Sequence, residues 1–105
     1  MYSIDYIELA LSAIKDKIRE DAVEKFRKSY TQLLETEAQV RRAKVQAQIL
    51  EMSKLRIELR KFEDTYNQVK KQCGNIESVD NYLLDVRKHI KLISENKNRS
   101  LLNRQ

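Results

Sequence analysis

The sequence has no proline, no tryptophan, one glycine and one cysteine among its 105 residues. Tight turns in β-sheets depend on residues that adopt a positive φ or hold φ fixed. A chain with so few of them is poorly suited to an all-β or a doubly wound α/β fold. One cysteine cannot form an intramolecular disulfide, and small secreted domains usually need such bridges. We therefore expect an all-α fold in an intracellular protein, with cytoplasmic and nuclear locations not distinguished.

Long hydrophobic runs are also missing. No window approaches eighteen uncharged apolar residues, so we expect no membrane span. The first thirteen residues contain Asp5 and Glu8 but no lysine or arginine, unlike a signal or transit peptide. At 41% apolar and 35% charged residues, the chain is nevertheless too apolar for a disordered tail. The composition predicts a folded helical domain.

Apolar residues recur at steps of three and four from Ile7 to Cys73, without a glycine or proline between them. This spacing is that of an amphipathic helix and not of a strand. From Met52 onward the pattern is a strict heptad. It predicts a long helix over residues 5–73.

The middle of this pattern is less regular, because every apolar step from Ile18 to Ala38 is four residues. Each such step drifts by about 40° around a helix of 3.6 residues per turn. Either the contact face winds around the helix, or the helix breaks near residues 20–37 and gives a three-helix arrangement. Three patterns typical of helix N-termini lie in or beside this segment, starting at Asp21, Ser29 and Thr36.

The only clear stop signal is Gly74, which suits the left-handed conformation that often ends a helix. The sequence predicts a turn over 74–78, a last helix over 79–96 and a frayed tail over 97–105. A short connection makes the last helix an antiparallel neighbour of the long one. Residues 1–105 thus form one domain, a helical hairpin of coiled-coil type.

In such a hairpin the last helix is too short to cover the first. The apolar positions before residue 55 would stay open to water, which a soluble monomer does not tolerate over so large an area. We therefore expect another chain to cover them, either a second copy or a different subunit. The predicted partner-binding residues are Ile7, Leu11, Ile14, Ile18, Phe26, Tyr30 and Leu34.

Positive charge is concentrated in the centre of the chain. Residues 39–74 hold nine basic and four acidic side chains, in a protein of net charge +5. An anionic partner would bind there, and a nucleic-acid-binding coiled coil that uses residues 41–61 is one alternative function. The candidate residues for it are Arg41, Arg42, Lys44, Arg56, Arg60 and Lys61.

Catalytic chemistry has little support. One histidine and one cysteine cannot supply the three or four ligands of a metal site, and no phosphate-binding or nucleophile motif occurs. We expect no enzyme activity, no metal and no cofactor. The sequence favours a protein-interaction or scaffold subunit, and a small helical chaperone-like or secretion-apparatus subunit remains a further alternative. A compact monomeric three-helix bundle is the competing architecture.

Overall fold

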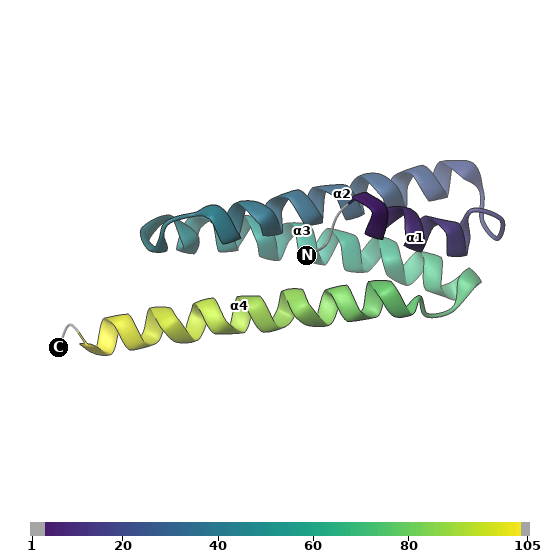
Figure 1. Cartoon of the computed structure of the whole chain (residues 1–105). Coiled ribbons are helices and arrows are strands. Elements are labelled where there is room, and N and C mark those ends of the chain that lie inside the picture. Colours follow the sequence, from purple (N-terminus) through teal and green to yellow (C-terminus); the bar gives the residue numbers. More distant parts are fainter. Residues whose placement is uncertain (1–3, 104–105) are drawn as a thin grey trace.

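The computed structural model describes the backbone of residues 4–103 and the side chains of residues 5–95. The described backbone contains four helices and no strand, so the expected all-α class is confirmed there. The helices are α1 (Ile4–Ile14), α2 (Glu20–Arg42), α3 (Val45–Cys73) and α4 (Glu77–Asn103). α2 and α3 run antiparallel side by side, and α4 lies along them (Figure 1). The short α1 lies at the end where α3 turns into α4, and the molecule measures 56 × 20 × 20 Å.

The expected single helix over 5–73 is wrong, because the chain reverses twice within it. The reversals lie between α1 and α2, at residues 15–19, and between α2 and α3, at residues 43–44. Both connections bring sequential helices back against each other. Residues 4–103 therefore form a bundle of four helices and not a hairpin of two.

Neither reversal needs glycine or proline. Arg19, Ala43 and Lys44 have φ values of −66°, −70° and −66° with ψ between 144° and 156°. Any L-residue adopts this extended conformation without strain. The amide N–H of Ala43 still donates to the carbonyl groups of Gln39 and Val40, at 3.0 and 3.3 Å. A helix can end here without any of the residues that usually mark an end.

The break suspected near residues 20–37 occurs at the start of this segment, where α2 begins at Glu20 with Asp21 in its first turn, and α2 is continuous through the rest of it. Ser29 and Thr36 lie inside the helix, where the Thr36 hydroxyl donates to the Gln32 carbonyl at 2.7 Å. The residues that α2 buries follow alternating steps of three and four, with Thr36 beside them, so the face does not drift. They are Val23, Phe26, Tyr30, Leu33, Thr36, Glu37 and Val40.

The heptad predicted for α3 is buried as expected, from Met52 to Val69. α3 ends at Gly74, which has φ 75° and is the one residue of the described chain with a positive φ. The turn is shorter than predicted, because α4 already begins at Glu77. α4 also continues beyond residue 96, the expected end, as far as Asn103. The predicted frayed tail is therefore helical over 97–103, and residues 104–105 lie outside the described part.

Aromatic side chains from three helices meet in the core. The Tyr30 ring from α2 lies with its centroid 4.7 Å from that of Phe62 in α3 and 5.4 Å from that of Tyr82 in α4. Phe26 and Tyr66 extend the cluster, and all five side chains are buried. Such tilted ring pairs add to the free energy of burial. This cluster explains why α4 lies against the α2–α3 pair.

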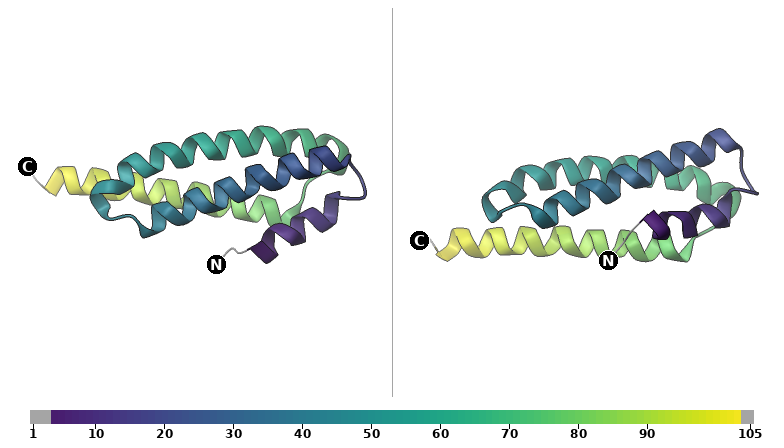
Figure 2. Two further views of the ribbon diagram at one scale, coloured as in Figure 1. Left: turned by 90° about the horizontal axis from the view of Figure 1, so that it is seen from above. Right: turned by 45° about the horizontal axis from the view of Figure 1, so that its top comes forward.

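α1 covers the remaining end of the core with Ile7, Leu11 and Ile14, all buried. The Tyr6 hydroxyl donates to the carbonyl of Ser78, which ties α1 to the first turn of α4. Two further views show α1 beside the start of α4 and under the start of α2 (Figure 2). The fold thus covers most of the large apolar side chains of residues 5–95.

Candidate interaction surface

The residues predicted to bind a partner lie in the core. Phe26 and Tyr30 are fully buried with Ile7, Leu11 and Ile14, and Ile18 and Leu34 are half-buried against the same core. The expectation that these positions stay uncovered is wrong, because the two additional reversals fold the chain's own helices over them. A contact surface for another molecule must be sought elsewhere.

The six basic residues predicted to bind an anionic partner are all exposed. They do not form one patch. Arg41 donates to the carboxylate of Glu37, whereas Arg42 and Lys44 flank the α2–α3 turn. The other three, Arg56, Arg60 and Lys61, lie on α3.

Between residues 45 and 57, α3 also exposes large apolar side chains. Leu50 and Ile57 are 65% and 55% exposed, and Ile49 and Val45 are 44% and 75% exposed. Leu50 and Ile57 are seven residues apart, so they lie on the same side of the helix. Met52, Leu55 and Leu59 of the same segment are buried, so this side faces away from the core. We call this side of α3 over residues 49–61, with Leu50, Ile57 and the cations beside them, the outer face of α3.

Cations border this apolar stripe on both sides. At 100° per residue, Arg56 and Arg60 lie about 60–100° to one side of Ile57, and Lys54 and Lys61 lie about 40–60° to the other. Arg56 reaches the hydroxyl of Ser94 in α4, at 3.4 Å. Arg60 forms no ion pair with any acidic side chain that the structure describes.

The two lysines of this border have acidic neighbours on their own helix. Lys54 lies 3.5 Å from Glu51, and Lys61 lies 3.6 Å from Glu58. The lysine side chains are 58% and 66% exposed and those of the glutamates 21% and 24%, so both ammonium groups are open to solvent while the carboxylates are mostly covered. The outer face therefore presents Leu50 and Ile57 between cations, and Glu51 and Glu58 lie with Lys54 and Lys61 at the grooves beside α2.

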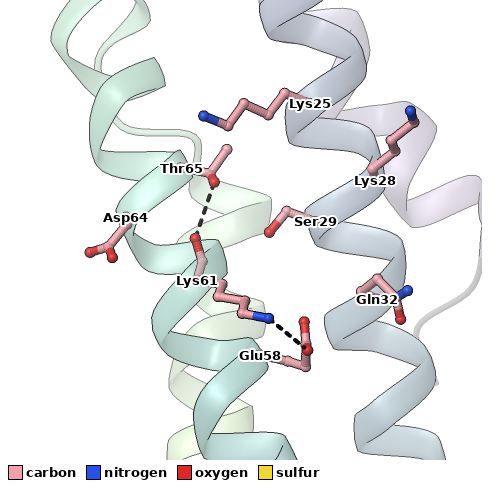
Figure 3. A pocket seen from close by; sticks show the side chains of 8 residues that line it. All are labelled: Lys25, Lys28, Ser29, Gln32, Glu58, Lys61, Asp64 and Thr65. Carbon is pink, nitrogen blue, oxygen red and sulfur yellow. Dashed lines mark hydrogen bonds and ion pairs between the residues drawn. The ribbon is translucent and has the colours of Figure 1, made fainter.

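Lys61 and Glu58 also line an open groove between α2 and α3 (Figure 3). Lys25, Lys28, Ser29 and Gln32 line the α2 side of this groove, and Asp64 and Thr65 complete the α3 side. The Thr65 hydroxyl donates to the carbonyl of Lys61, at 3.1 Å. No histidine or cysteine lines the groove, and its charges of both signs select no ligand of one kind. It is a solvated seam between two helices.

His89 lies in a different environment from the exposed helix surface that its lysine neighbours in sequence suggest. Its Nδ1 atom lies 3.2 Å from Oε1 of Glu37, a carboxylate that is buried between α2 and α4. Arg41 donates to the same oxygen. This cluster connects α2 to α4 and provides the buried carboxylate with charged or polar neighbours, as burial requires. We interpret it as structural.

Within the described residues, no three histidine, cysteine or carboxylate side chains gather as metal ligands. The thiol of Cys73 is half-buried against the core at the end of α3. None of the helices in the described part of the chain has a stretch long and apolar enough to cross a lipid bilayer. The outer face of α3 is the most distinctive surface of this part of the chain.

No protein-family model, curated protein or solved structure matches this chain significantly. A proposal for the function of this chain therefore rests on the chemistry of its surface.

Sequence reasoning found the basic half of the outer face but missed Leu50 and Ile57. Both fall outside the buried heptad of α3, and each has charged or polar neighbours. One signal was available: the two residues are seven apart and form a second, sparser stripe on the opposite side of the same helix.

Proposed function

We propose that this chain is a non-enzymatic protein-interaction module that binds another protein through the outer face of α3. The observation that supports the proposal is the exposure of Leu50 and Ile57 on the side of α3 that faces away from the core, with Ile49 exposed among the arginines beside them. An apolar stripe rimmed by polar groups is typical of an interaction surface. Each such side chain contributes about 1.5–3 kcal/mol when it is fully covered.

The outer face suits a protein better than a nucleic acid. Single-stranded nucleic acids bind by stacking bases on exposed aromatic rings, and aliphatic side chains offer no such platform. The rings of Phe26, Tyr30, Phe62, Tyr66 and Tyr82 are all buried. Nucleic-acid binding through phosphates alone stays the alternative, and the basic residues of α3 are the observation that favours it.

A photo-crosslinking amino acid in place of Ile57 tests the proposal. In cells that express the protein, we expect a discrete adduct with one other protein after irradiation. The matched control carries the same amino acid in place of Leu84, which is 49% exposed on α4. We expect this control not to give the adduct, and a second change, Leu50→Ser, to remove the adduct from the Ile57 position.

The captured protein is then purified and titrated with the wild-type chain and with Ile57→Ser. Loss of affinity by at least about tenfold in the variant supports the proposal. The same adduct from the Ile57 and the Leu84 positions would contradict the proposal. An adduct that disappears on treatment with nuclease would also contradict it, because the captured molecule would then be a nucleic acid.

A further inference from the structure

We infer that the outer face of α3 accepts one amphipathic helix whose apolar stripe is bordered by acidic side chains. This inference rests on the proposed function and adds the chemistry of the partner. It follows from the width of the apolar stripe, from the charges beside it and from the side chains that the rest of the bundle leaves exposed.

The stripe is narrow enough for one helix, because Leu50 and Ile57 lie only about 20° apart around the axis of α3. Leu50 and Ile57 are separated by two helical turns, about 10.5 Å along the axis. Ser53 lies between them at the intervening heptad position, and its hydroxyl donates within α3 to the carbonyl of Ile49, at 3.5 Å. A small side chain with its hydrogen bond already made allows close approach of another helix. Alternating steps of three and four are the geometry of helices that pack at a small crossing angle.

The charges select an acidic partner. Arg56 and Arg60 lie on one side of the stripe, and Lys54 and Lys61 lie on the other, where a pairing helix would place its flanking residues. Acidic side chains at those positions would meet cations on both sides. Basic side chains would meet like charges, which costs free energy and slows association.

The same charges disfavour a second copy of this chain. In a two-fold dimer through the outer face, the arginines and lysines of one copy face those of the other. The acidic helix of the chain itself, α1, is no better suited. Its residues Ile7, Leu11 and Ile14 are buried, and among its described side chains, those of residues 5–14, Leu9 is the one strongly exposed large apolar side chain. One anchor on α1 does not match the two anchors of the outer face, Leu50 and Ile57.

A designed peptide provides the test. The probe has three heptads, with leucine at the two core positions of each heptad and glutamate at the two flanking positions. Repulsion between the glutamates keeps the free probe from pairing with itself. The control peptide is identical except that lysine replaces each flanking glutamate. Binding to the whole chain is measured by fluorescence anisotropy at low and at physiological salt.

We expect the acidic probe to bind at least about tenfold more tightly than the basic one, and to lose affinity as salt rises. The double variants Leu50→Ser/Ile57→Ser and Arg56→Glu/Arg60→Glu each weaken binding by about tenfold or more. Leu84→Ser is the matched control and leaves the affinity unchanged. Circular dichroism of every variant verifies that the bundle is intact.

Equal binding of both peptides, or no binding of either, overturns the inference. Sedimentation that shows a dimer abolished by Ile57→Ser overturns it in favour of a second copy. Binding of duplex DNA or of RNA that Arg56→Glu/Arg60→Glu abolishes overturns it in favour of a nucleic acid. If the Ile57 position captures a protein in cells while the acidic probe fails to bind, the acidic-helix inference alone is wrong. If that position captures no protein, the proposed function is wrong as well.

Discussion

The amide N–H of Ile76 donates to the hydroxyl oxygen of Tyr66 at 2.7 Å, in the buried turn between α3 and α4. The same hydroxyl donates to the carboxylate of Asp80, at 2.8 Å, in the first turn of α4. One side chain of α3 therefore holds both the turn and the start of the next helix. This contact sets where α4 begins, and α4 covers one side of the core.

Replacing Tyr66 with phenylalanine keeps the ring but removes this link. The N–H of Ile76 then stays buried without an acceptor, which costs about 1–3 kcal/mol. We expect Tyr66→Phe to lower the free energy of unfolding by that amount, measured by urea denaturation at neutral pH. The phenylalanine ring retains the stacking on Phe62, so a loss below about 0.5 kcal/mol would show that the hydroxyl does not hold the turn.

The same residue predicts a loss of stability in alkali. Burial is the largest of the effects that raise the pKa of Tyr66 to about 12, above the ordinary value of 10.0. The unfolded chain ionises this phenol near its ordinary pKa, whereas the folded chain keeps it protonated up to its raised pKa. The protonated Tyr66 hydroxyl therefore contributes fully to the free energy of unfolding below about pH 10. This contribution is lost as the pH rises to about 12, and the free energy of unfolding falls by up to about 1.4 kcal/mol per pH unit.

Urea denaturation of the wild type and of Tyr66→Phe across this pH range measures the effect. We expect the stability difference between the two proteins to narrow as the pH rises. Parallel curves, with a constant difference, would contradict the raised pKa. The comparison cancels the contributions of the other tyrosines, which both proteins share.

Gly74→Ala is expected to destabilise the turn through the backbone alone. Gly74 has φ 75° and ψ −173°, a region that residues with a Cβ atom rarely adopt. A Cβ atom built there meets no other atom within 4 Å, so no steric clash contributes. We expect a loss of about 1–3 kcal/mol in thermal or urea denaturation. Asn75→Ala is the matched control, because Asn75 is exposed and has a negative φ, and equal losses in the two variants would refute the explanation.

Phe26→Ala and Ile57→Ala separate the core from the outer face. Phe26 is fully buried among Tyr30, Phe62 and Tyr66, so we expect its truncation to cost about 3–5 kcal/mol. Ile57 is exposed, so its truncation changes stability by less than about 0.5 kcal/mol. Urea denaturation measures both. A large loss in Ile57→Ala would place this residue in the fold and remove it from the proposed surface.

The parts of the fold that the sequence predicted are those with a local cause. The apolar heptad from Met52 to Val69 identifies a helix face by spacing alone, and Gly74 identifies a helix end by its conformational freedom. The reversal at residues 43–44 has no such signal, and the one at residues 15–19 has only the pattern at Asp21, whose side chain does not cap α2. They use extended backbone that every residue can adopt, so only the gain from packing the helices together selects them.

The candidate site shows the same division. Its cations were predicted, because a charge excess is visible in the composition of residues 39–74. The apolar anchors were not, because exposure of Leu50 and Ile57 depends on which side of α3 the other helices cover. For Phe26 and Tyr30 the error was the opposite one: they were predicted to bind a partner but are buried in the chain's own core. Their apolar character predicts that they are buried, but it does not show whether the same chain or another chain covers them.

The sequence by itself determined that this protein is helical and that the centre of the chain is basic. It also determined which residues of α3 form the buried heptad, from Met52 to Val69. These properties follow from side-chain periodicity, from the shortage of turn residues and from charge. Only the tertiary structure decided that the chain covers its own core and leaves the outer face of α3 open. The physical reason is that an apolar residue of one helix is buried only where another helix packs against it. The free energy gained when α1, α2 and α4 pack around α3 decides which apolar residues are covered, and no single segment contains that information.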